Sequence, residues 1–313
     1  MRNAFAKAVT ELGDEYSELV MLAGDIGNRL FDDFKGKHPD RFYNCGVAEA
    51  NMTGLASGLA ASGLRPITYT ITPFNTVRCL EQIRLDICYP NLPVIVVGTG
   101  AGLSYASLGA THHSMEDIAI LRTLPNMHVV CPADPVEVRL AVKDALRLGR
   151  PTYIRLGKKG EPRIHPGEPD FQIGRGIVVR EGSEVVILSV GNMIAPSLAC
   201  AEQLEQHGVS TQVVSMHTVK PLDEALLRGA FADKKLVVVV EEHSLTAGAG
   251  SAVLEWGHAR RLDLGKVMCV GGPDRFLSGC GEQDEARELL GLTSESICQQ
   301  VMERLGLHNA SGA

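Results

Sequence analysis

The segment PVIVVG (93–98) is apolar along its whole length, and a glycine-rich stretch follows it directly. Other short apolar runs resemble it: LVMLAG (19–24), RPITYTI (65–71), MHVVCP (127–132), PTYIRL (151–156), EVVILSV (184–190), TQVVSM (211–216), KLVVVVEE (235–242) and KVMCVGG (266–272). Segments with helical periodicity flank most of these runs. Continuous apolar strands that alternate with helices are typical of parallel sheets covered on both faces. The sequence therefore predicts an α/β fold with two mostly parallel sheets.

The candidate strands form two series with a gap between them. Residues 157–183, GKKGEPRIHPGEPDFQIGRGIVVREGS, are rich in glycine, proline and charge, a composition typical of a linker. We expect a first domain at 1–160, a linker at 161–182 and a second domain at 183–313. A chain of 313 residues is long enough for two such domains.

The composition argues against several classes of protein. Hydrophobic residues make up 45% and charged residues 21%, as in ordinary globular proteins, which excludes a disordered chain or a coiled coil. The net charge of −7 argues against nucleic acid or an anionic membrane surface as a partner. No apolar run is long enough to span a bilayer, and charged residues interrupt the N-terminal segment where a signal peptide needs an apolar core. We expect a cytoplasmic protein.

Glu49 lies in GVAEANMTGLASGLAASG (46–63), which predicts a helix with a face of small residues. One interpretation is an acid that is favoured near a helix N-terminus. The other is a carboxyl group turned into an interface, where burial favours its protonated form. The small residues over 47–62 also suit a close domain or subunit contact.

The glycine-rich stretch GTGAGLSYASLGATHH (98–113) contains no Walker A lysine, so it predicts a loop that lines a pocket or a plain structural loop. His112 either caps the following helix or faces a substrate as a neutral imidazole. Neither His112 nor His113 has a carboxylate or cysteine spaced to complete a metal site, and the cysteines form no C-x-x-C pair. Arg155 ends a strand where open sheets bind ligands, and it either binds an anion or forms a surface salt bridge.

Several segments, taken in order, resemble the transketolase family. RFYNCGVAEANMTGLASGLAASGLRP, ITPFNTVRCLEQIRLDICYPNLPV and LGATHHSMEDIAILRTLPNMHVVCPADPVE are similar to its pyrimidine-binding domain. SVGNMIAPSLACAEQLEQHGVSTQVVSMHTVKPLD and VEEHSLTAGAGSAV are similar to its C-terminal domain. The resemblance covers about residues 5–306.

The resemblance implies a thiamine diphosphate site. In this family the glutamate that matches Glu49 hydrogen-bonds the pyrimidine ring of the cofactor and promotes its reactive tautomer. Phe74 matches an aromatic residue that lies against this ring, and Ile71 replaces a second aromatic residue. Asp25 matches an aspartate at the end of the first strand, and Asn28 is a weaker match in a shortened loop.

The resemblance also implies how substrate is bound. His112 matches the substrate-facing histidine, and Arg155 matches the phosphate-binding arginine. Leu108 stands where the family usually has an aspartate that contacts a donor hydroxyl, and Gly100 falls near a missing phosphate-contacting histidine. We therefore expect a related but atypical donor or acceptor, one that is deoxygenated or carries a different anion.

The chain contains no G-D-G motif for the cofactor's diphosphate and Mg²⁺. The resemblance therefore implies the C-terminal subunit of a split transketolase, active with an N-terminal subunit that holds both, in a heterotetramer with two copies of each chain. Alternatives are the β subunit of a 2-oxo-acid dehydrogenase decarboxylase, an enzyme similar to 1-deoxyxylulose-5-phosphate synthase, and a non-catalytic regulatory subunit. We expect His217, Glu242 and His243 of the second domain to be structural.

Overall fold

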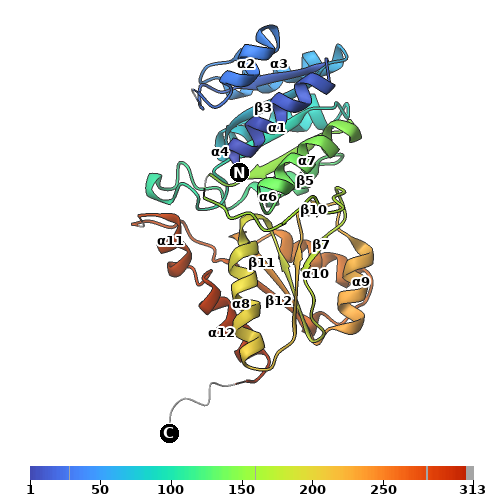
Figure 1. The fold of residues 1–313 in the computed structure, drawn as a ribbon, viewed down its shortest axis with the longest axis vertical. Helices are drawn as coiled ribbons and strands as arrows, with labels where there is room; N and C mark the ends of the chain where they lie inside the picture. Colours follow the sequence, from blue (N-terminus) through green and yellow to red (C-terminus); the bar gives the residue numbers. More distant parts are fainter. Residues whose placement is uncertain (28, 159, 280, 308–313) are drawn as a thin grey trace.

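The computed structural model of the protein describes residues 1–27, 29–158, 160–279 and 281–307. Figure 1 shows two lobes, one built from the first half of the chain and one from the second. Each lobe contains a sheet with helices packed against it, so the predicted α/β class with two mostly parallel sheets is confirmed. Among the described residues, no helix combines the length and apolarity needed to cross a membrane.

The larger sheet has seven strands in the order β10-β5-β6-β4-β3-β1-β2. Its strands are β1 (Leu19–Ala23), β2 (Phe42–Asn44), β3 (Arg65–Ile71), β4 (Ile95–Thr99), β5 (His128–Val130), β6 (Thr152–Leu156) and β10 (Thr218–Lys220). Neighbouring strands are parallel except for β10, which runs antiparallel to β5. Every residue of β1, β4 and β6 is buried, as expected for strands covered on both faces.

The smaller sheet has five strands in the order β12-β11-β8-β9-β7. Its strands are β7 (Ile177–Arg180), β8 (Val185–Ser189), β9 (Thr211–Ser215), β11 (Leu236–Ser244) and β12 (Val267–Gly272). The central strands are parallel, and β7 closes one edge antiparallel to β9. β7 lies within the segment expected as a linker.

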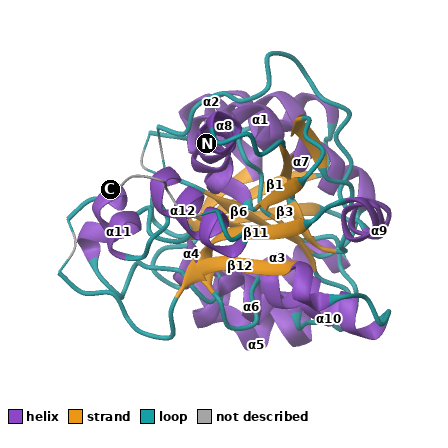
Figure 2. Ribbon diagram, turned by 90° about the horizontal axis from the view of Figure 1, so that it is seen from below, coloured by secondary structure: helices purple, strands orange, loops and turns teal. Residues whose placement is uncertain are grey.

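Helices cover both faces of the two sheets, as Figure 2 shows from below. The helices are α1 (Arg2–Glu15), α2 (Asp32–Lys37), α3 (Glu49–Ala61), α4 (Thr72–Asn75), α5 (Leu80–Gln82), α6 (Asp117–Arg122), α7 (Pro135–Leu148), α8 (Ile194–Gln206), α9 (Glu224–Asp233), α10 (Ala249–Ala259), α11 (Gln283–Leu289) and α12 (Ser294–Arg304). The start of α7 has the expected capping residues. There the Asp134 carboxylate accepts hydrogen bonds from the amides of Val136 and Glu137, and Pro135 is the first helical residue.

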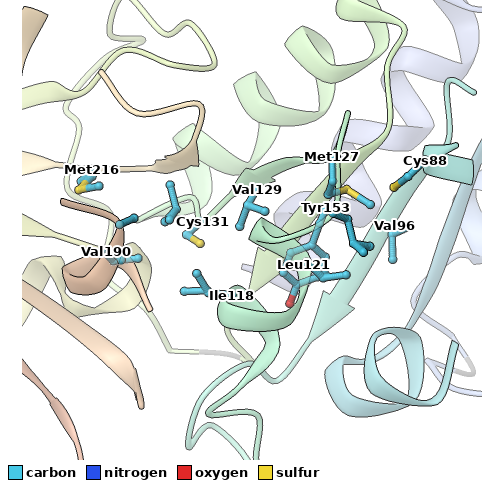
Figure 3. Packing of buried hydrophobic residues seen from close by; sticks show 14 of the residues in the cluster. Cys88, Val96, Ile118, Leu121, Met127, Val129, Cys131, Tyr153, Val190 and Met216 are labelled. Carbon is cyan, nitrogen blue, oxygen red and sulfur yellow. The ribbon is translucent and has the colours of Figure 1, made fainter. Parts of the chain in front are cut away.

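One of the hydrophobic clusters spans both lobes. A single cluster of buried side chains includes Val129, Cys131 and Tyr153 of the first lobe and Val190 and Met216 of the second. Figure 3 shows these side chains spread from the second lobe to the first. β10 adds a second connection, because its residues come from the second half of the chain but pair with the first sheet. The lobes are therefore joined by packing and by backbone hydrogen bonds.

Candidate functional site

Three residues singled out in the sequence, and Lys158 in addition, lie after strands of the larger sheet. Asp25 follows β1, Phe74 follows β3, His112 lies in the loop after β4, and Lys158 follows β6. These four strands are adjacent and parallel, so their carboxyl ends lie along one edge of the sheet. Ligands of open α/β sheets bind at such an edge.

Glu49 is the first residue of α3 and is only 2% exposed. Its Oε2 accepts a hydrogen bond from Nη1 of Arg78 at 2.7 Å. The Arg78 guanidinium carbon also lies 4.2 Å from the centre of the Phe74 ring. Gly24, directly after β1, packs closely here, because a Cβ atom there would lie 3.1 Å from the side chain of Thr70 and 3.4 Å from Cγ of Glu49. Glu49 and Phe74 thus hold one flat, N–H-donating group between them.

A row of ring contacts continues from Phe74 along the sheet edge. The Phe74 and His112 ring centres are 5.3 Å apart, and those of His112 and Tyr105 are 6.1 Å apart, both edge to face. The Lys158 ammonium lies 4.7 Å from the centre of the Tyr105 ring. The row thus runs from a buried acid to a partly exposed cation.

His112 is oriented by its own loop. Its Nδ1 lies 2.9 Å from the hydroxyl of Thr111, which leaves Nε2 for a ligand. Burial, with help from the neighbouring His113, lowers the pKa of His112 below its ordinary value of 6.5, so the ring is neutral at pH 7. His113 points elsewhere, because its Nε2 lies 3.0 Å from the carbonyl of Ala106. The rings of the two adjacent histidines therefore have different hydrogen-bond partners, and only His112 joins the row of rings.

The Tyr105 ring explains why position 100, where the family resemblance implies a histidine, is a glycine in this chain. The φ of Gly100 is +74°, and a Cβ atom there would lie 1.9 Å from the Tyr105 ring. A side chain at this position would therefore displace Tyr105 from the row. Leu108 is 52% exposed on the same loop and offers no polar atom to a substrate.

Asp25 lies at the other end of the site. It adopts a positive φ of 45°, and its carboxylate accepts a hydrogen bond from the Asn44 amide at 2.9 Å. A cavity of about 470 Å³ lies beside it, lined by Arg2, Asn3, Asp25, Ile26, Gly27, Arg29 and Leu30. Ile71 is partly buried and caps α4, the helix that carries Phe74. Asn28 lies outside the described residues.

Arg155 is not in the row. It is 4% exposed, and its Nε donates to Oδ2 of Asp117 at 2.7 Å while Nη2 donates to the carbonyls of Ser114 and Glu242. Tyr153 also donates to Asp117, so the two charges are paired and hydrogen-bonded inside the molecule. The expected anion-binding role does not suit so buried a side chain. Lys158, which no sequence pattern singled out, is the cation that reaches the row.

Among the described residues, no group of three or more histidine, cysteine, aspartate or glutamate side chains is placed to hold a metal ion. The described cysteines are all unpaired. The site geometry thus consists of a buried acid, aromatic rings, a neutral imidazole and cations at both ends.

Two family models match the chain: "Transketolase, pyrimidine binding domain" over residues 1–162 and "Transketolase, C-terminal domain" over residues 174–297. The chain belongs to the transketolase family. Within this family it is similar to the 6-deoxy-6-sulfo-D-fructose transketolase subunit SqwH of Clostridium sp. (strain MSTE9), with 36% identity over 97% of this chain and 94% of that protein. It is 32% identical to the 1-deoxy-D-xylulose-5-phosphate synthase of Desulfotalea psychrophila over 96% of this chain and 47% of that longer protein.

A solved structure also resembles this transketolase-family chain over nearly its whole length. It is described as "Split gene transketolase, inactive beta4 tetramer", with 37% identity and a TM-score of 0.88 over 98% of both chains. The domain pair, the chain length and the order of elements are therefore those of a C-terminal transketolase subunit.

Proposed function

We propose that this chain is the C-terminal subunit of a thiamine diphosphate-dependent transketolase that transfers a two-carbon ketol unit from a ketose to an aldose. The observation that carries the proposal is the contact of buried Glu49 with a planar N–H donor stacked on Phe74. The aminopyrimidine of thiamine diphosphate is also planar and offers a face for stacking, and its ring nitrogen would accept a hydrogen bond from a protonated Glu49 where Arg78 now donates one. The residues present therefore fit this half of the cofactor.

Each side chain of the row has a task in this proposal. Glu49 holds a proton at Oε2 toward the pyrimidine nitrogen, and Phe74 orients the ring by packing against its face. His112, neutral and with Nε2 free, exchanges a proton with a substrate hydroxyl. The bound cofactor supplies the chemistry that breaks and forms the carbon–carbon bond.

The diphosphate half of the cofactor and Mg²⁺ belong to a partner in this proposal. An N-terminal subunit would bind them, and two copies of each chain would form a heterotetramer. Exposed apolar side chains near Glu49 and Arg78 in the chain support such a contact: Val47 is 77% exposed, Val77 49% and Leu55 43%. The similar β4 tetramer is described as inactive, which agrees with a chain that needs a partner. Unpaired cysteines agree with a cytoplasmic location.

The substrate we propose carries an anion but lacks one hydroxyl contact of ordinary transketolase donors. Lys158 offers a positive charge at one end of the row, and Arg2 and Arg29 line the cavity at the other. Leu108 and Gly100 supply no polar atom where a hydroxyl or phosphate contact would be made. The similar subunit from Clostridium is named for a sulfonated deoxy sugar, which supports this class.

The test combines the chain with a G-D-G-containing N-terminal subunit, Mg²⁺ and thiamine diphosphate, and then screens ketose and 2-oxo-acid donors. We expect ketol transfer, which Glu49→Gln abolishes without changing assembly, while the exposed Glu81→Gln control stays active. A fully active Glu49→Gln enzyme would overturn the mechanism. If pyruvate were the only donor accepted, the result would favour a reaction of the 1-deoxyxylulose-5-phosphate synthase type. If no donor were turned over, the result would favour a regulatory subunit.

A further inference from the structure

The loop that carries Tyr105 and His112 rests on the second lobe. In Figure 1 this teal loop lies at the junction of the lobes, on the same side as α11. Leu103 and Ala106 pack with Ala286 of α11 in a small buried cluster, and Ser244 donates a backbone hydrogen bond to the carbonyl of Met115. The second half of the chain therefore helps to set the position of this loop.

Glu242, in β11, is the polar centre of this contact. Its side chain is fully buried, and its Oε1 accepts a hydrogen bond from the backbone amide of Leu103 at 2.7 Å. A Cβ atom on Gly102, whose φ is +62°, would lie 2.3 Å from the same oxygen. The loop thus approaches the carboxylate so closely that only glycine fits beside it.

Two side chains of α11 hold the carboxylate in place. Nε2 of Gln283 donates to both carboxylate oxygens at 2.9 and 3.0 Å, and Nε of Arg287 donates to Oε2. Gln283 also reaches the Ser104 hydroxyl at 3.4 Å. A carboxylate with this many donors has a fixed orientation, and the Leu103 amide is one of the groups that it fixes.

We propose that Glu242 is a positioning residue for the active site, through which the C-terminal half holds the substrate-facing loop in its working conformation. Loss of the carboxylate leaves the Leu103 amide and the Arg287 guanidinium without their partner at the base of this loop. Tyr105 and His112 follow within the same loop, so their placement along the sheet edge depends on that anchor. The consequence for catalysis rests on the proposed function, whereas the consequence for the loop does not.

The adjacent residue Glu241 provides a matched control. It is equally buried, on the same strand, and its carboxylate accepts hydrogen bonds from the amides of Ala249 and Gly250 at the start of α10. Those amides belong to the second lobe. A change at Glu241 therefore removes a comparable buried carboxylate without touching the loop.

Amide hydrogen exchange of the full chain separates the two residues. Glu242→Gln should speed exchange across residues 100–113 about tenfold, as expected when the charged acceptor of a hydrogen bond becomes a neutral amide oxygen, and leave the start of α10 unchanged. Glu241→Gln should do the reverse. Equal exchange in the loop for both variants would overturn the proposal.

Gln283→Ala keeps the test decisive if Glu242→Gln does not fold, because Gln283 is only partly buried. It should loosen the same loop to a smaller extent, and an unchanged loop would contradict the proposal. In the reconstituted enzyme, Glu242→Gln should lower kcat about 10- to 100-fold with thiamine diphosphate affinity unchanged, as for a misplaced catalytic group. Normal kcat with a loosened loop would overturn the positioning role, whereas an inactive parent enzyme would overturn only the proposed function.

Discussion

Arg78 donates a hydrogen bond to Glu49 across 2.7 Å, although the arginine side chain is 44% exposed and the glutamate side chain only 3%. The same guanidinium lies over the Phe74 ring. One half-exposed cation therefore occupies both of the contacts that we assign to the cofactor's pyrimidine. A ligand that binds Glu49 and Phe74 must displace it, and the half-exposed side chain has open solvent to move into.

Removal of Arg78 should accordingly tighten cofactor binding. A half-exposed ion pair contributes about 0.5–1 kcal/mol, so Arg78→Ala should lower the Kd of thiamine diphosphate about two- to fivefold in the reconstituted complex. Isothermal titration calorimetry measures this. Arg84→Ala, an exposed arginine nearby in the chain, should leave the Kd unchanged. Weaker binding by Arg78→Ala would mean that Arg78 contacts the cofactor rather than replacing it.

The rate should depend on pH through His112. Because burial lowers the pKa of this imidazole from 6.5, the ring should stay neutral and competent below the pH at which an ordinary histidine gains its proton. We expect kcat/KM to be flat near pH 7 and to fall only at lower pH, with His112→Asn about 100-fold slower and without this acid limb. An identical acid limb in the variant would assign the titration to another group.

Lys158 should matter only for charged substrates. Lys158→Ala should raise KM about 10-fold for substrates that carry a phosphate or sulfonate, the effect of losing one charge-assisted contact. Uncharged substrates should be turned over unchanged, and so should all substrates by the control Lys143→Ala, which alters an exposed lysine on α7. A loss that is equal for charged and uncharged substrates would contradict an anion-binding role.

The ion pair of Asp117 and Arg155 should matter for stability. Asp117→Asn leaves a buried guanidinium without its counter-charge, which should cost about 3–5 kcal/mol of the free energy of unfolding. Urea denaturation measures this cost, and the exposed Asp33→Asn control should change it by less than about 0.5 kcal/mol. A small effect at Asp117 would mean that solvent reaches the pair.

The Asp117 carboxylate should also make the free energy of unfolding depend on pH. Burial alone would raise the pKa of Asp117, but the attraction of Arg155 and His243, together with the hydrogen bonds from Arg155 and Tyr153, outweighs it and holds that pKa below the ordinary 3.8. The unfolded chain therefore takes up the proton first, so this stabilisation is present above pH 3.8 and is lost as the pH falls through the folded-state pKa. Asp117→Asn should lack this part of the acid dependence.

Local pattern predicted most of the strands, because a strand buried on both faces is apolar along its whole length. The segments at 65–71 and 235–242 correspond to β3 and β11. β2 and β10 escaped prediction because neither lies in a continuous apolar run, unlike the equally short β5, and each is defined by its pairing. In particular, the pairing of β10 with β5 joins residues about 90 positions apart, and no window of sequence contains both.

The site was predictable where a residue's role follows from its place in an element. Glu49 was expected in the first turn of a helix and is the first residue of α3. The choice between Arg155 and Lys158 was not predictable, because both are cations near the same strand end and only the tertiary structure gives Arg155 a buried aspartate. Nor could sequence reveal that a ring from five residues further along fills the space at Gly100.

The strand β10 has a practical consequence for anyone who wishes to dissect this polypeptide. A fragment that ended before residue 218 would leave the outer edge of β5 bare, and a bare edge invites pairing with a second molecule. It would also lose Lys220, whose ammonium group holds the carbonyls of Arg122 and Leu124 at the end of α6. The two lobes are therefore poor candidates for separate expression, and chimaeras made by exchanging one of them should carry the β10 segment along with the first.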